Sequence, residues 1–405
     1  HYHHDPDDPA TLSTDFIPVV IEDHNGGLWV GADEGGLNKF NPATDNFTAY
    51  RHDPDDPTSL SDDDVWSLHE DSQGTLWVGT WGGGLNRFDP RPSGSAETFT
   101  RYQHDPEDPH SISDDVIRTI FEDHTGTLWL GTNGGGLNRF DRETETFSHY
   151  LHHPDDPDSL SDNVVRTIYE DQTGVLWLGV DGGGLNKFDR QTETFTHYRE
   201  KDGLVNDTIY GLLEDDQGKL WLSTNNGLSK FDPQTETFKN YNASDGLQSN
   251  EFNQGAHHRS QSGELFFGGI NGFNAFFPDQ IEDNPHPPPV VLTGFQIFNE
   301  PVSFDRPLAE VTDIELSWQD SVFSFEFAAL DYTAPGENRY AYKLEGFDKD
   351  WIEAGNRRFA TYTDLDGGEY LLQVRGTNND GVWNEAGAGI RITITPPPWK
   401  TWWAY

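Results

Sequence analysis

A long motif that recurs along the first two thirds of the chain constrains the fold more than any other feature. Its first copy consists of residues 28–31 (Leu-Trp-Val-Gly) and 35–40 (Gly-Gly-Leu-Asn-Lys-Phe). The motif returns around four later tryptophans and, in degenerate form, around Phe266, so that successive anchors lie 48, 52, 48, 44 and 45 residues apart. The five tryptophan anchors are Trp29, Trp77, Trp129, Trp177 and Trp221. A period of this length is typical of a four-stranded blade of a β-propeller.

Each copy divides into four short apolar segments separated by turn residues. In the third copy these segments are residues 116–121, 127–131, 137–141 and 146–150. The polar stretch 123–126, which ends in Gly, and the three glycines 134–136 are suited to the reversals between strands. We therefore expect an all-β fold in which residues 1–283 form a β-propeller of four-stranded blades, with six repeats visible. The tryptophan column is expected in the core between blades.

The repeats and their connecting segments resemble the two-component regulator propeller repeat of bacterial hybrid sensor kinases. The connecting segment 53–61 (Asp-Pro-Asp-Asp-Pro-Thr-Ser-Leu-Ser) and its copies carry part of this likeness, which covers residues 1 to about 280. Propellers of that family usually have seven blades, so the resemblance implies that a blade is missing upstream. Residues 1–4 are expected to be the end of its last strand. The chain has no Met and starts within the pattern, so we expect it to be a piece of a longer polypeptide.

A second domain is expected after a proline-rich linker at 284–289, which consecutive prolines should hold in a stiff polyproline II conformation. Beyond it the long period stops and short alternating segments follow, at 290–298, 321–327, 340–344, 370–375 and 390–395. Their spacing favours an immunoglobulin-like β-sandwich over residues 290–397. Tyr340, Tyr342, Tyr362 and Tyr370, with the residues around them, resemble the three-tyrosine (Y_Y_Y) domain that follows such propellers in the same receptors.

The last segment, 398–405, contains three Trp and one Tyr. In the receptor family a similar segment leads into a transmembrane helix, and clustered aromatic residues prefer the membrane interface. We therefore expect a membrane-proximal segment, with the helix itself outside this chain. The alternative is a hydrophobic tail that packs on the sandwich.

Charge and composition exclude several classes of function. With 26 Lys and Arg against 70 Asp and Glu, the net charge is −44, which disfavours binding of nucleic acid. The acidic connecting segments could solvate the surface or bind Ca²⁺, and we favour the first. The chain contains no Cys, no metal-ligand spacing and no catalytic motif, so neither a cofactor nor an enzymatic activity is expected.

Positions that vary inside a rigid repeat are the best candidates for ligand binding. Aligning the blades at the start of the first strand gives one column, consisting of Pro18, Trp66, Arg118, Arg166, Tyr210 and Asn253. Aligning the turn after the second strand gives another, consisting of Asp33, Trp81, Asn133, Asp181, Asn225 and Asn271. In an up-and-down blade both positions lie at the same end of the propeller, which we call the mouth. Nine of these residues are the predicted ligand-binding set: Trp66, Trp81, Arg118, Arg166, Tyr210, Asn133, Asp181, Asn225 and Asn253.

Aromatic faces and polar side chains around a funnel suit a polyhydroxylated ligand. The resemblance implies the periplasmic sensor region of a membrane receptor that binds an oligosaccharide and acts as a homodimer in the full-length protein. A scaffold or adhesion propeller with a protein partner is the alternative, and a propeller lyase is a second one.

Overall fold

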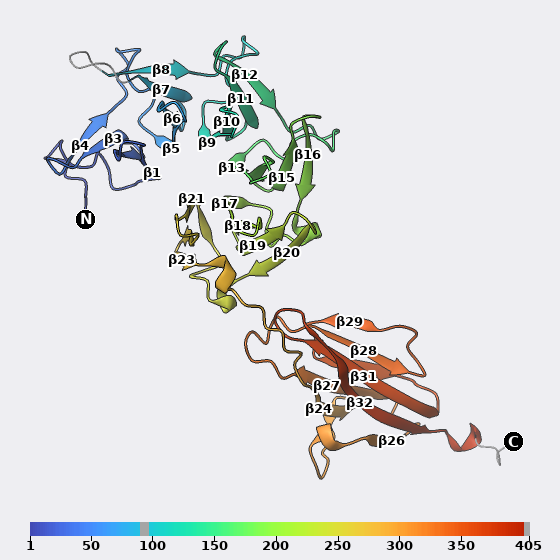
Figure 1. Ribbon diagram of the computed structural model, residues 1–405. Helices are drawn as coiled ribbons and strands as arrows, with labels where there is room; N and C mark the ends of the chain where they lie inside the picture. Colours follow the sequence, from blue (N-terminus) through green and yellow to red (C-terminus); the bar gives the residue numbers. More distant parts are fainter. Residues whose placement is uncertain (90–96, 401–405) are drawn as a thin grey trace. The chain divides into compact units, whose positions relative to one another are not determined.

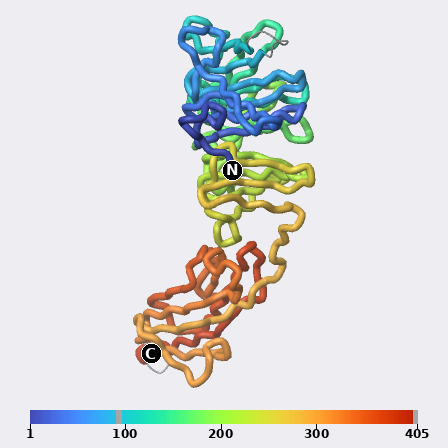
Figure 2. Tube along the Cα trace, turned by 90° about the vertical axis from the view of Figure 1, so that its left-hand side faces the viewer, coloured from blue at the N-terminus to red at the C-terminus, as the bar shows by residue number. Residues whose placement is uncertain are grey.

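The computed structural model describes residues 1–89 and 97–400, with the side chain of Lys400 excepted. It divides into two compact units, His1–Gln280 and Ile281–Tyr405. The chain passes from the first unit (blue to yellow) into the second (orange to red) in Figures 1 and 2. The boundary falls close to the expected one at residue 283.

The first unit consists of small antiparallel sheets, each of which runs in sequence order. Within the described residues, five sheets have four strands and the sixth has three. Blade 1 comprises β1 (Val19–Glu22), β2 (Leu28–Ala32), β3 (Gly36–Asn41) and β4 (Asn46–Tyr50). Blade 2 comprises β5 (Val65–Glu70), β6 (Leu76–Thr80), β7 (Leu85–Asp89) and β8 (Thr98–Tyr102). Blade 3 comprises β9 (Ile117–Glu122), β10 (Leu128–Thr132), β11 (Leu137–Asp141) and β12 (Thr146–Tyr150).

The remaining blades follow the same plan. Blade 4 comprises β13 (Val165–Glu170), β14 (Leu176–Val180), β15 (Gly184–Asp189) and β16 (Thr194–Tyr198). Blade 5 comprises β17 (Ile209–Glu214), β18 (Leu220–Thr224), β19 (Gly227–Asp232) and β20 (Thr237–Tyr241). Blade 6 comprises β21 (Phe252–Arg259), β22 (Leu265–Gly269) and β23 (Gly272–Phe276). The first strands of successive blades are neighbours around the centre (Figure 1). The expected fold of four-stranded propeller blades is confirmed.

In each of blades 1 to 5, an aspartate fixes the turn between the first two strands. In blade 2, Oδ1 of Asp71 accepts hydrogen bonds from the backbone N–H groups of Gln73 and Thr75, and Oδ2 accepts the indole N–H of Trp77 at 2.8 Å. Gly74 closes the turn with φ of +80°, a conformation that favours glycine. The same carboxylate-to-indole bond recurs in blades 1, 3, 4 and 5. A residue pair six positions apart therefore links each turn to the core.

The tryptophans lie between blades, as expected. Trp77 is 1% exposed, and its ring contacts Phe140 of the next blade at 5.4 Å between centroids. Arg142 of blade 3 donates to Asp71 of blade 2 at 2.7 Å and to Glu122 at 3.0 Å. Apolar packing and an ion pair thus join the same two blades.

The acidic connecting segments form local turns. In the copy that leads into blade 2, the carboxylates of Asp53 and Asp56 accept backbone N–H bonds from Asp55 and Thr58. His52 bonds through Nδ1 to the carbonyl of Leu60 at 2.8 Å, which closes the whole segment. The equivalent bond recurs at three other histidines, namely His4, His104 and His152. These four histidines therefore hold the connecting segments closed.

Residues 1–4, expected to be the end of a strand, are not paired in a sheet. Tyr2 nevertheless packs against Phe40 and Phe47 and donates to Asp45. Tyr50, at the end of β4, packs in the same way against the next blade. Tyr2 therefore occupies the position of a final-strand tyrosine without the strand.

The second unit is a sandwich of two sheets. One sheet has the order β25-β24-β27-β30 and the other β26-β32-β31-β28-β29. The strands of the first sheet are β24 (Val290–Ile297), β25 (Glu300–Pro301), β27 (Val322–Ala329) and β30 (Phe359–Thr363). The strands of the second are β26 (Asp313–Ser317), β28 (Tyr340–Glu345), β29 (Ile352–Gly355), β31 (Gly368–Thr377) and β32 (Trp383–Thr395). Strand β26 pairs with β32 in parallel, and the other pairs are antiparallel.

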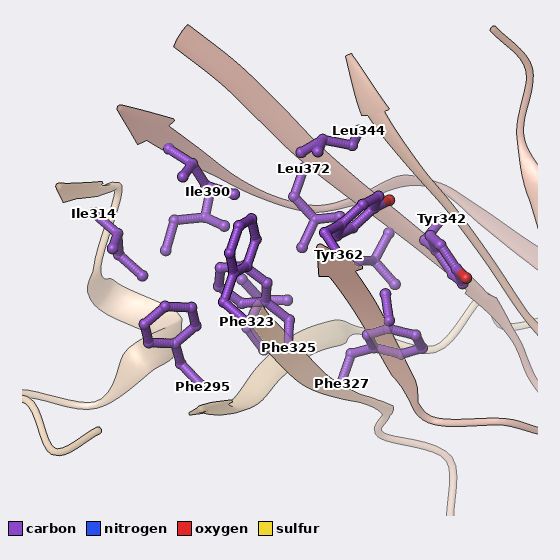
Figure 3. Packing of buried hydrophobic residues seen from close by; sticks show 14 of the residues in the cluster. Phe295, Ile314, Phe323, Phe325, Phe327, Tyr342, Leu344, Tyr362, Leu372 and Ile390 are labelled. Carbon is purple, nitrogen blue, oxygen red and sulfur yellow. The ribbon is translucent and has the colours of Figure 1, made fainter. Parts of the chain in front are cut away.

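Aromatic residues from both sheets form the sandwich core (Figure 3). Phe323, Phe325 and Phe327 alternate along β27 and are at most 2% exposed. Tyr362 packs beside them, and its hydroxyl donates to Asp348 at 2.8 Å. Burial and this bond both raise the pKa of Tyr362. The hydroxyl of Tyr340 accepts the backbone N–H of Ala329, so these buried tyrosines keep a polar partner.

The proline-rich linker is bound to the sandwich. The side-chain amide of Asn378 donates to the carbonyls of Asn284 and His286, and that of Asn384 donates to the carbonyl of Pro288 at 2.7 Å. Prolines lack an N–H but keep their carbonyl, so the linker can be held through its acceptors alone. The stiffness expected from the prolines is therefore reinforced by side chains far along the chain.

The aromatic segment 398–405 is described only to residue 400. Its Trp399 is 61% exposed and contacts Trp318 edge-on, at 4.9 Å between ring centroids. Residues 401–405, which complete the expected membrane-proximal segment, lie outside the described residues. No helix within the described ranges is both long and apolar enough to span a membrane.

Candidate functional site at the mouth of the propeller

In each of blades 2 to 5, a one-residue β-bulge near the start of the first strand positions the residue of the first aligned column. The register of β5 on β6 passes from Val65 opposite Thr80 to Ser67 opposite Gly79, which leaves Trp66 unpaired. The same irregularity in β9, β13 and β17 leaves Arg118, Arg166 and Tyr210 unpaired. A bulge re-aims the extra side chain relative to the regular pleat. The same backbone irregularity thus positions the variable residue in all four blades.

The second column lies beside the first. The backbone N–H of Trp81 donates to the carbonyl of Asp64, two residues before the bulge of its own blade, at 2.9 Å. Corresponding bonds in blades 1, 3 and 4 tie the same turn to the segment that precedes the first strand, through Asp33, Asn133 and Asp181. The two columns therefore meet at the same end of the blades, the mouth.

An aromatic pair and an arginine form one side of the site. The rings of Trp66 and Trp81 lie 4.6 Å apart between centroids, and the indole N–H of Trp66 donates to Asp33 at 3.3 Å. The guanidinium of Arg118 lies over the Trp81 ring at 4.7 Å, and its Nε donates to Asn133 at 2.7 Å. One face of Trp81 is thus covered by a cation before any ligand arrives.

A second arginine forms the other side. Arg166 donates to Asp181 at 2.6 Å and lies over the ring of Tyr210 at 5.1 Å. Its Nη1 and the Nη1 of Arg118 both donate to Oε1 of Gln254 on β21, at 2.7 Å and 2.6 Å. Gln254 therefore links blade 6 to blades 3 and 4. We call the linked set the mouth cluster: Asp33, Trp66, Trp81, Arg118, Asn133, Arg166, Asp181, Tyr210 and Gln254.

Electrostatics differ across the cluster. Burial and repulsion from Arg166 lower the pKa of Arg118 to about 10, and together they outweigh the attraction of Asp181, Tyr210 and Asp114. Arg118 still carries its charge at neutral pH. Burial alone would raise the pKa of Asp181, but the hydrogen bond and charge of Arg166 hold it below its ordinary value. Arg118 and Asp181 are therefore both ionised at pH 7.

Seven of the nine predicted residues belong to the mouth cluster, whereas Asn225 and Asn253 do not. Both are exposed, and the contacts that connect the cluster do not include them. Their assignment as ligand-binding residues stays a prediction from the alignment alone.

Gln254 was missed because the bulge of blade 6 is longer than the others. The register of β21 on β22 passes from Phe252 opposite Gly269 to His257 opposite Phe267. The aligned position, Asn253, is exposed, and its neighbour Gln254 reaches the arginines. Gly255 has φ of +72°. A glycine inside a strand pattern is the sequence signal that indicates an irregular backbone there.

A groove of about 460 Å³ between blades 2 and 3 offers a competing site. Its cations already have partners, because Arg142 is paired with Asp71 and Glu122 and Arg87 with Glu145. These bonds belong to the contact between blades. Within residues 1–89 and 97–400, no group of three or more His, Cys, Asp or Glu could hold a metal ion. The mouth cluster remains the stronger candidate.

Family comparisons agree with both units. The two component regulator propeller family matches residues 59–82, 111–134, 159–182 and 203–226, and the Y_Y_Y domain family matches residues 331–395. The chain carries regulator propeller repeats followed by a Y_Y_Y domain. Each propeller match begins in the segment before a first strand and ends at the next turn, so the matched regions include both columns of the mouth.

The chain is similar to a histidine kinase and to solved extracellular domains. Over 312 residues, 74% of this chain, it is 30% identical to Histidine kinase P4 of Formosa agariphila and covers 22% of that protein. It is 25% identical to the extracellular domain assigned to the hybrid two component system BT3049 of B. thetaiotaomicron, with a TM-score of 0.80. That match covers 95% of this chain and 51% of the solved domain.

A second extracellular domain from B. thetaiotaomicron, assigned to the one component system BT4673, shares the fold. It is 23% identical, with a TM-score of 0.54, over 98% of this chain and 53% of that domain. The chain thus spans about half of each solved domain and about a fifth of the histidine kinase. The chain is thus similar to extracellular domains of bacterial signalling systems, which supports an extracytoplasmic sensory domain.

Proposed function

We propose that the mouth cluster binds an oligosaccharide, such as a polysaccharide breakdown product, and that this binding is the signal of a periplasmic sensor. One observation carries the proposal: four equivalent bulges bring aromatic and cationic side chains, Trp66, Arg118, Arg166 and Tyr210, to the same end of the propeller. Tyr210 and the Trp66–Trp81 pair offer flat apolar surface for sugar C–H groups, and the polar members offer donors and acceptors for hydroxyls.

The proposed path of the signal from the mouth cluster follows from the order of the domains along the chain. The Y_Y_Y sandwich follows the propeller directly, and the aromatic segment 398–405 follows the sandwich. We propose that the sandwich transmits the signal to a transmembrane helix beyond residue 405, and that two copies of the receptor act as a homodimer. A receptor with a single membrane-crossing helix can report binding by a change in how two copies are arranged. The kinase output belongs to the cytoplasmic part of such a receptor.

A thermal-shift screen of this chain against a panel of neutral and acidic oligosaccharides tests the binding step. A ligand at 100 times its Kd stabilises the folded state by about 2.7 kcal/mol, which is readily detected. We expect at least one oligosaccharide to raise the Tm of the wild-type chain, and Tyr210→Ala to abolish the shift.

Two results would contradict the proposal. One is a panel in which no oligosaccharide raises the Tm at all. The other is a shift that survives in Tyr210→Ala and in Trp66→Ala, because the ligand would then bind elsewhere. Lys187→Ala, on the outer part of blade 4, is the control and should keep the full shift.

A further inference from the structure

The two arginines of the mouth cluster converge on a neutral oxygen. Arg118 and Arg166 come from neighbouring blades, yet both donate to Oε1 of Gln254, at 2.6 Å and 2.7 Å. Hydrogen bonds from a guanidinium to an anion are stronger than those to a neutral amide. Gln254 therefore occupies a position at which an anionic acceptor would be held more tightly.

Charge around this point is unbalanced. In the described part of the chain, Asp181 is the only carboxylate hydrogen-bonded to either guanidinium. The other partners of Arg118 are the neutral amide of Asn133 and the amide of Gln254. The two guanidiniums thus share one hydrogen-bonded carboxylate, although Asp33 belongs to the same cluster and the charge of Asp114 also acts on Arg118.

Arg166 also keeps an unused donor. Its side chain is 14% exposed, and its Nε is buried without a hydrogen-bond partner among the described residues. Buried polar groups in proteins are nearly always paired, so an unpaired one indicates a missing acceptor. The chain carries a net charge of −44, so a half-buried pair of cations at the mouth differs in charge from most of the chain.

We propose that the ligand of the mouth carries an anionic group, the carboxylate of a uronic acid or a sulfate ester, which replaces Gln254 as the shared acceptor of Arg118 and Arg166. This inference rests on the proposed saccharide-binding function and narrows it to acidic saccharides. The sugar ring lies against Tyr210 or the Trp66–Trp81 pair, and its acidic group lies between the guanidiniums. Binding breaks the link between blade 6 and blades 3 and 4.

Two substitutions of Gln254 separate this proposal from a general structural role. Gln254→Glu supplies an internal carboxylate to both arginines, so the variant should have a higher Tm than wild type and bind acidic saccharides at least about tenfold more weakly. Gln254→Ala removes the competing oxygen and should bind them at least about threefold more tightly. A residue that merely supported the fold would weaken binding in both variants.

The binding experiment is calorimetric titration with three probes: trigalacturonate, a galactose trisaccharide that carries sulfate esters, and the same trisaccharide without sulfate. We expect an acidic probe to bind at least about tenfold more tightly than the neutral one. Whether trigalacturonate or the sulfated probe binds decides between carboxylate and sulfate. Arg139→Gln, also on blade 3 but paired with Glu193, is the matched control and should bind as wild type does.

The inference is overturned if the neutral trisaccharide, or a neutral member of the screening panel, binds as tightly as the acidic ones. It is also overturned if Gln254→Glu fails to raise the Tm, a result that does not depend on which sugar is used. In either case the proposed function survives as long as some oligosaccharide binds at the mouth. Failure of every saccharide to bind overturns both.

Discussion

The same residue type serves two purposes in neighbouring positions of one blade. Trp77 is almost completely buried, donates to Asp71 and packs on the next blade. Trp81, four residues later, is half-buried, and its ring packs against Trp66 and lies under the guanidinium of Arg118. At the scale of the residue, the environment separates a core tryptophan from a binding one.

This contrast gives a prediction. Trp77→Ala should lower the free energy of unfolding by about 3–5 kcal/mol, because it leaves a large cavity between blades. Trp81→Ala should cost about 1 kcal/mol, which corresponds to its ring contacts, and should weaken ligand binding at least about tenfold. Urea denaturation and calorimetric titration of both variants measure these effects. Equal destabilisation by the two substitutions would show that Trp81 belongs to the core.

At the scale of the element, the repeat period predicted the blades, their turns and the tryptophan core. These features depend on local patterns that recur in each copy, such as the aspartate six residues before each tryptophan. The mouth was predictable only in part, because a bulge follows from how two strands pair. Arg118 and Arg166 could be aligned from sequence since their bulges are equivalent. Gln254 could not, since β21 has a different bulge and its partners lie on other blades.

The turn aspartate of blade 3 gives a pH-dependent prediction. The carboxylate of Asp123 is 1% exposed and accepts bonds from Trp129 and Arg190. Burial alone would raise its pKa, but the bonds from Thr125, Trp129 and Thr127 and the charge of Arg190 hold the pKa below the ordinary 3.8. Such a carboxylate stabilises the fold above pH 3.8, and its contribution is lost as the pH falls through the lowered pKa.

Asp123→Asn should therefore lower the free energy of unfolding by about 2 kcal/mol at pH 7, because it removes the charged acceptor of Arg190 and Trp129 while Arg190 keeps its ion pair with Glu170. The difference from wild type should shrink as the pH falls below 3.8. Asp155→Asn, in an exposed connecting segment, is the control and should change stability by less than about 0.5 kcal/mol. Urea denaturation across pH 2.5 to 7 measures the difference, and a gap that stays constant would contradict the assigned role of the carboxylate.

At the scale of the whole molecule, the account depends on how the two units are connected. Strand β23 and the short 3-10 helix Pro278–Gln280 end the first unit, and Asn284 is already hydrogen-bonded to the second. Residues 281–283 are the whole interval between them. A connection this short, continued by a proline-rich segment in which Asn378 bonds the carbonyls of Asn284 and His286 and Asn384 bonds that of Pro288, suits a relay that depends on mechanical coupling.

Replacing residues 285–289 by a Gly/Ser stretch of equal length tests this coupling. In a receptor that carries the chain with its natural flanking sequence, we expect ligand-dependent output to fall severalfold while ligand affinity is retained. The physical reason is that Gly and Ser restore the backbone freedom that proline removes. His286→Ser, which keeps all the prolines, is the control. Undiminished output from the Gly/Ser variant would mean that the stiffness of the linker is irrelevant to signalling.

The most direct test of the central claim is a structure of this chain with the oligosaccharide that stabilises it most. The account predicts a ligand at the mouth, in contact with side chains from at least blades 2, 3 and 4, including Trp81 or Trp66 and both Arg118 and Arg166. A ligand in the groove between blades 2 and 3, or on the sandwich, would contradict it.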